Sequence, residues 1–139
     1  MRRGEEDVGI NSRWYPDTLV ARIKEINRVK NRIILIQGDA LAHLENYQTG
    51  KRKLAFFIDP PYSSVGERLY TYGKVDHEKL FEIAAELPGQ VLMTYHDADE
   101  VHRLVRKFRF KYRRVKMLNR QNASKTELLV CKDFDWLKR

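Results

Sequence analysis

The chain has 139 residues, which suits a single domain over residues 1–139, and its hydrophobic fraction of 42% is enough for a core. Lys and Arg outnumber Asp and Glu by 27 to 19, and the net charge of +8 favours a polyanionic partner, nucleic acid first, over a merely soluble basic protein. One cysteine excludes an internal disulfide framework, and without a long apolar stretch or a signal peptide the sequence predicts a cytoplasmic protein with no membrane segment.

The first half of the chain predicts alternating helices and strands. The helices follow from apolar residues at helical spacing, with Asp17 as a candidate N-cap, and the strands from short apolar runs. The first strand ends at Gln37-Gly38-Asp39, and Asp59 comes directly after the second. The predicted elements are a helix at 18–29, a buried strand at 33–36, a short helix at 40–47 and a buried strand at 54–58.

The second half begins after a long loop and predicts two more helices and three strands. Asp76 is a candidate cap of the first helix, and Asp97 with Glu100 has capping-box-like spacing before the second. Residues 108–113 alternate aromatic and basic side chains, a period of two that predicts a strand with one basic face. The elements are a helix at 77–87, a strand at 91–95, a helix containing Val101, Leu104 and Val105, and strands at 108–113 and 126–131.

Alternating helices and buried strands predict an α/β fold with a mostly parallel sheet. No helix separates the last two strands, so the sheet is expected to end in an antiparallel C-terminal hairpin. Ligands of such sheets bind at the carboxyl ends of the strands. Asp39, Asp59 and the pair Tyr95-His96 all lie at the ends of predicted strands, which predicts one shared crevice.

The sequence Asp59-Pro60-Pro61-Tyr62 ends a predicted buried strand and has the composition of a site for a planar amine. The prolines stop the strand and stiffen the turn. An exocyclic amine on a nucleobase is a weak nucleophile, and hydrogen bonds to the Asp59 carboxylate and the Pro60 carbonyl would favour a tetrahedral nitrogen. Tyr62 would stack on the base, which must flip out of a duplex to reach the pocket. The alternative is a simple proline turn beside a partly buried tyrosine.

Basic side chains supply a candidate nucleic-acid surface. Arg109, Lys111 and Arg113 lie in a stretch without acidic residues and are candidate phosphate contacts. The alternative for them is a solvated strand face. Arg13 is a further candidate, in a segment whose aromatic residues would equally well cover the core. The histidines are scattered without metal-ligand spacing, so no metal site is predicted.

Three segments in order resemble the Dam-like adenine-specific DNA methyltransferases, and the likeness extends from about Ile10 to Val130. They are Gly38-Asp39-Ala40, Asp59-Pro60-Pro61-Tyr62 and Lys125-Thr126-Glu127-Leu128-Leu129.

The resemblance implies a Rossmann-like sheet with a reversed terminal hairpin, S-adenosylmethionine as cofactor and double-stranded DNA as partner. It implies that Asp59 and Pro60 bind the target amine and that Tyr62 stacks on the adenine, with Pro61 completing the motif. It also implies that Asp39 contacts the adenine ring of the cofactor and that Asp59 borders the cofactor site.

One family element, a Phe-x-Gly-x-Gly loop that holds the methionine part of the cofactor, has no counterpart in this sequence. The chain therefore resembles the C-terminal part of such an enzyme, and its sheet is expected to be incomplete at the N-terminus. A truncated or split enzyme, completed by a second chain or an N-terminal segment, is one expectation. A catalytically inactive DNA-binding or assembly remnant is the other. Methylation of an amine in RNA or protein is a third reading, which Asp59 disfavours.

Overall fold

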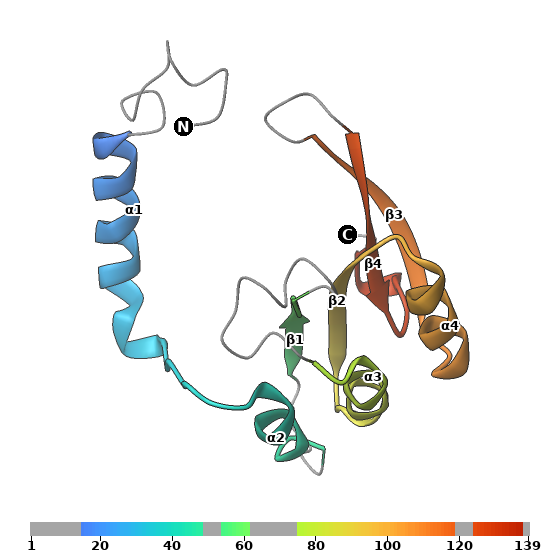
Figure 1. Ribbon diagram of the computed structural model, residues 1–139. Coiled ribbons are helices and arrows are strands. Elements are labelled where there is room, and N and C mark those ends of the chain that lie inside the picture. The colour runs from blue at the N-terminus through green and yellow to red at the C-terminus, as the bar shows by residue number, and fades with distance from the viewer. Residues whose placement is uncertain (1–14, 49–53, 62–74, 119–123, 138–139) are drawn as a thin grey trace. The chain divides into compact units, whose positions relative to one another are not determined.

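The structure is a computed structural model that describes residues 15–48, 54–61, 75–118 and 124–137 (Figure 1). The chain divides into two compact units, Met1–Gln37 and Gly38–Arg139. Arg13, Tyr62 and the predicted loop after Tyr62 lie outside the described residues. No helix in the described ranges is long and apolar enough to cross a membrane.

The first unit contains α1 (Pro16–Val29) and the 3-10 turn η2 (Lys30–Arg32). The predicted helix is thus confirmed, but Asp17 is not its N-cap. Tyr15 occupies that position without a side-chain hydrogen bond, and Pro16 begins the helix. Pro is favoured there because the first helical N–H groups have no partner inside the helix, and Asp17 in the first turn suits the positive end of the dipole.

The predicted buried strand at 33–36 is wrong. These residues follow η2 without regular secondary structure, and their side chains are 54–94% exposed. Ile33 has the extended backbone of a strand, with φ −106° and ψ 127°. A β-branched run becomes a strand only where another strand accepts its ladder of hydrogen bonds, and none of the described strands pairs with it.

The second unit is built on a four-stranded sheet of order β1-β2-β4-β3 (Figure 1). Its strands are β1 (Ala55–Ile58), β2 (Gln90–His96), β3 (Lys111–Leu118) and β4 (Ser124–Cys131). Strands β1 and β2 pair in parallel, whereas β4 is antiparallel to both β2 and β3. The mixed α/β class and the C-terminal hairpin are confirmed.

The expectation of a mostly parallel sheet is wrong for the described residues. Only one of the three strand pairings is parallel, because only α3 (His77–Glu86) connects two neighbouring strands by a crossover. The hairpin returns β4 to the sheet between β2 and β3, which makes the other two pairings antiparallel.

The core lies on one face of the sheet. Val91, Met93 and Tyr95 alternate along β2 with less buried residues and are almost fully buried, since successive strand side chains point to opposite faces. Helices α2 (Ala40–Glu45), α3 and α4 (Asp99–Lys107) supply the other side of this core. Their contributing side chains are Leu41, Leu44, Phe81, Ile83, Ala84, Val101, Leu104 and Val105.

The opposite face of the sheet is covered only in part. Cys131 is fully buried there, and its thiol donates to the carbonyl oxygen of Asp133 at 2.6 Å in the C-terminal segment. Phe57 on β1 is 69% exposed, although a strand of a parallel pair is usually covered on both faces. The edge of the sheet at β1 therefore presents apolar surface.

The boundary between α4 and β3 differs from the predicted strand at 108–113. Phe108 ends the helix, and the strand begins only at Lys111. Arg109 has a φ of 59°, its N–H donates to Arg106 O at 3.3 Å, and the Phe110 N–H donates to Val105 O at 2.9 Å. This pair of bonds is a Schellman motif, so the alternating pattern includes a helix end that mimics a strand.

Replacing Gly89 by Ala is expected to lower the free energy of unfolding by more than about 2 kcal/mol. Gly89 has a φ of +95°, and an added Cβ would lie 2.2 Å from the Leu54 carbonyl oxygen. Gly38→Ala is the matched control, because nothing lies within 4 Å of its added Cβ. Urea unfolding of both variants measures the difference, and equal midpoints would contradict the close approach at Gly89.

Replacing Arg109 by Gly is expected to raise the free energy of unfolding by about 0.5–1 kcal/mol relative to Arg109→Ala. Both variants lose the same side-chain charge, but only Gly adopts the left-handed conformation without steric cost. Thermal and urea unfolding of the two variants checks the result. A less stable Gly variant would show that residue 109 is not strained.

Candidate active site

Asp59 lies at the carboxyl end of the parallel pair β1 and β2. The register places Ile58 beside Met93, so the next residues along the two strands, Asp59 and Thr94, are also neighbours. The Thr94 hydroxyl donates a hydrogen bond to the Asp59 carboxylate. Pro60 is buried and Pro61 half-buried, so the turn is anchored in the protein while the Asp59 side chain remains exposed.

The crevice predicted for Asp39, Asp59 and Tyr95-His96 is divided by the sheet. His96 alternates with Tyr95 along β2 and lies on the face of Asp59, but Tyr95 does not. Thr94 lies on the same face as Asp59, whereas Tyr95 points to the helix-covered face and is buried. The Tyr95 hydroxyl lies 3.1 Å from His77 Nδ1, and its ring is 5.4 Å from that of Phe81. Tyr95 is therefore a core residue, and the groups that accompany Asp59 come from the alternate positions of β2.

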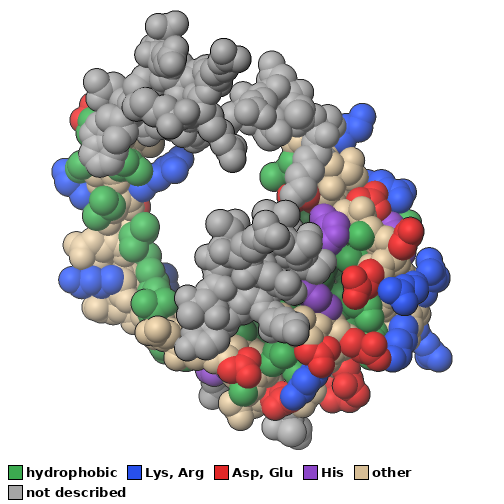
Figure 2. All heavy atoms as spheres, in the orientation of Figure 1, with side chains coloured by type: hydrophobic (Ala, Val, Ile, Leu, Met, Phe, Trp, Pro, Cys, Tyr) green, Lys and Arg blue, Asp and Glu red, His purple; other side chains and the backbone are tan. Residues whose placement is uncertain are grey.

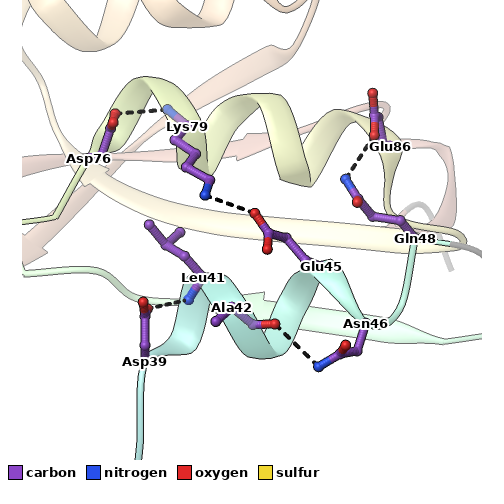
Figure 3. Close-up of polar contacts among 9 residues, drawn as sticks. All are labelled: Asp39, Leu41, Ala42, Glu45, Asn46, Gln48, Asp76, Lys79 and Glu86. Carbon is purple, nitrogen blue, oxygen red and sulfur yellow. Dashed lines mark hydrogen bonds and ion pairs between the residues drawn. The ribbon is translucent and has the colours of Figure 1, made fainter.

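Asp39 is the N-cap of α2 and does not follow a strand. Its carboxylate accepts from the Leu41 N–H at 2.9 Å (Figure 3). Helix α2 lies beside α3, where Lys79 forms an ion pair with Glu45 at 2.9 Å. The hydrogen bond and charge of Glu45 raise the pKa of Lys79, and the charges of Asp39 and Asp76 add to this. The Asp39 carboxylate thus begins a helix within a charged cluster.

Helix α3 begins as the sequence predicts. The Asp76 carboxylate accepts from the Lys79 N–H at 2.9 Å (Figure 3). This bond satisfies one of the N–H groups that the first turn leaves without an intrahelical partner.

Arg113 and Lys111 share a face of the sheet with Asp59. Arg113 is opposite Leu129, and Leu129 is opposite Thr94, so these three side chains form one row. The Arg113 guanidinium lies 4.4 Å from the centre of the Phe134 ring, which supports it. Three strand spacings separate β1 from β3, or roughly 14 Å.

A second basic surface lies on α4. Figure 2 shows Lys and Arg side chains gathered over this helix, with acidic side chains next to them over α3. The exposed basic residues of this region are Arg103, Arg106, Lys107 and Arg109. Lys107 forms an ion pair with Glu78 on α3, so part of this charge is neutralised within the protein.

A cluster that the sequence did not predict joins Asp97, His102 and Arg114. Arg114 Nε donates to one carboxylate oxygen of Asp97 at 2.6 Å, and His102 Nε2 lies 2.6 Å from the other. The hydrogen bond from Arg114 lowers the pKa of Asp97, and that from His102 adds to the effect. Asp97 is therefore not a helix cap as predicted, and Ala98 takes the N-cap position of α4.

Two kinds of chemistry find no support in the described part of the chain. No group of three or more His, Cys, Asp or Glu side chains there is arranged to hold a metal ion. Burial raises the pKa of the Cys131 thiol to about 11, so this cysteine is not an activated nucleophile.

No protein-family model matches the chain, and no curated protein matches it. The chemistry of the site therefore has to be argued from its own residues and their positions.

Replacing Asp97 by Asn is expected to lower stability at pH 7 and to have less effect in acid. A carboxyl whose pKa is lowered by folding stabilises the protein above its ordinary value of 3.8 and loses that contribution as the pH falls through the lowered pKa. Urea unfolding of the two proteins at several pH values from 7 to about 2.5 tests this. Asp99→Asn, outside the cluster, is the control, and a stability difference independent of pH would contradict the role of the Asp97 charge.

Proposed function

We propose that the chain is an adenine-specific DNA methyltransferase, or a truncated or split form of one, that transfers a methyl group from S-adenosylmethionine to the exocyclic amine of adenine. The observation that carries this proposal is the Asp59-Pro60 turn at the carboxyl end of β1. There the Asp59 carboxylate is held by a hydrogen bond from the neighbouring parallel strand. A fixed carboxylate suits a ligand that donates hydrogen bonds, and the carboxyl end of a strand is where such sheets bind ligands.

The residues of the motif have separate tasks in this chemistry. Asp59 and the Pro60 carbonyl accept hydrogen bonds from the two N–H groups of the amine and favour a tetrahedral nitrogen with its lone pair directed outward. Pro61 stiffens the turn, and Tyr62 stacks on the flipped base. The rate enhancement comes from positioning and from electrostatic stabilisation of the developing positive charge on nitrogen.

S-adenosylmethionine would supply an electrophilic methyl group. Asp39 would contact the adenine ring of this cofactor, and the position of its carboxylate at the start of α2 suits a donor such as an amine. The residues of this sequence fit only that end of the cofactor, because no Phe-x-Gly-x-Gly loop is present for the methionine end. A second chain or another segment would have to provide it.

Two further features favour a DNA substrate. Lys111 and Arg113 lie on the face of the sheet that carries Asp59, where they would contact the phosphate backbone on either side of a flipped base. The reversed hairpin with β4 between β2 and β3 agrees with the terminal hairpin that the resemblance implies.

The open edge of β1 favours a second candidate function, an inactive DNA-binding or assembly remnant of such an enzyme. Strand β1 pairs only with β2 among the described strands, and Phe57 on it is largely exposed. An exposed edge strand is a template for pairing with another chain. A second chain that completes the sheet is compatible with both candidates.

Incubation with methyl-labelled S-adenosylmethionine and mixed-sequence duplex DNA is expected to label adenine. Asp59→Ala should reduce this labelling by at least about a hundredfold, because the amine loses a charged acceptor. Glu82→Ala removes an exposed carboxylate on the outer side of α3 and is the matched control. If the wild-type and Asp59→Ala proteins give only the same background labelling, catalysis by this chain alone is refuted.

Calorimetric titration with S-adenosylmethionine separates the two candidates. An enzyme is expected to release or absorb heat in a saturable titration, whereas the remnant should bind DNA in a salt-dependent manner without binding the cofactor.

A further inference from the structure

Thr94 on β2 contacts the carboxylate at the end of β1. Its hydroxyl donates directly to the Asp59 carboxylate, although 35 residues separate the two in sequence. Nothing in the sequence around Thr94 indicates this contact, because it depends on the register between β1 and β2.

The position of Thr94 makes it a rigid donor. Strand β2 is held on one side by β1 and on the other by β4, where Thr94 is paired with Leu129. A threonine side chain in a strand has few accessible χ1 rotamers because its Cβ is branched. The hydroxyl is therefore held by an interior strand, whereas Asp59 extends from the end of an edge strand.

We propose that Thr94 is a positioning residue that orients the Asp59 carboxylate toward the amine of the target base. This inference rests on the proposed function for the identity of the ligand, but the orientation of Asp59 is a separate property. A carboxylate free to rotate would meet the amine in many geometries, whereas catalytic groups require an orientation held to within about 10–20°. The hydrogen bond from the Thr94 hydroxyl contributes to that constraint.

Two substitutions at Thr94 separate the hydrogen bond from the shape of the side chain. Thr94→Val keeps the branched shape and removes the donor, and Thr94→Ser keeps the donor and removes the methyl group. Amide spectra of both variants establish that the fold is retained. If Thr94→Val unfolds the protein, Thr94→Ala serves as a second variant without the donor.

The first measurement is the χ1 rotamer of Asp59, obtained from three-bond couplings of its carboxyl carbon to the backbone nitrogen and carbonyl carbon. A single rotamer is expected in the wild type and in Thr94→Ser, and averaged couplings in Thr94→Val. A single unchanged rotamer in Thr94→Val would overturn the proposal, whether or not the chain methylates DNA.

The second measurement compares the affinities of the protein for DNA with and without the target amine. Two duplexes are compared, one with adenine opposite an abasic site and one with purine, which lacks only the 6-amino group, at the same place. Phosphate contacts are common to both, so the ratio of the two affinities reports the amine. The wild type and Thr94→Ser are expected to prefer adenine about tenfold, and Thr94→Val about threefold or less.

The outcomes distinguish the positioning role from the proposed function. If Thr94→Val prefers adenine as strongly as the wild type does, the positioning role is overturned. If the wild type shows no preference, the amine site of the proposed function fails, and the Asp59 couplings alone then support or overturn the action of Thr94.

Discussion

The parallel pairing of β1 with β2 is the constraint on which the rest of the second unit depends. Because parallel strands need a crossover connection, α3 has to lie between them in sequence and pack on the sheet. The chain re-enters the sheet at Gly89, where the backbone passes so close to Leu54 that a side chain would not fit. The same register places Asp59 beside Thr94, so the geometry of the candidate site follows from the pairing.

The sequence predicted an element correctly wherever another element buries its apolar residues. The amphipathic helix α3 and the strand β2 are both present, since each has a partner that buries its apolar face. Residues 33–36 have the composition of a strand, but a strand also needs a neighbour, and composition does not report one. The predicted strand at 108–113 was wrong at its start for another reason. A helix end with Arg109 in the left-handed conformation, followed by a strand, gives the same alternation of side chains as a longer strand.

The sequence predicted the turn of the candidate site that carries Asp59, but not the contacts that support it. Asp59, Pro60 and Pro61 are adjacent in sequence, so their composition reveals a rigid turn with a carboxylate. Thr94 reaches Asp59 only through the register, and Arg114 reaches Asp97 only through the tertiary fold, since the two lie 17 positions apart in sequence. The spacing of Asp97 and Glu100 predicted a cap, but the Asp97 carboxylate instead accepts from Arg114 Nε and lies 2.6 Å from His102 Nε2.

The separation of charges on the sheet face gives the proposed function a physical rationale. A carboxylate that accepts hydrogen bonds from an amine also repels a nearby phosphate. The residues that bind the base and those that bind the phosphate backbone therefore have to lie apart. The row from Asp59 through Thr94 and Leu129 to Arg113 provides it, with an acidic group at one edge, a cation at the other and uncharged side chains between. A flipped base would extend toward the acidic edge while its strand followed the basic edge, and the two ends of the row would then attract different parts of one nucleic acid.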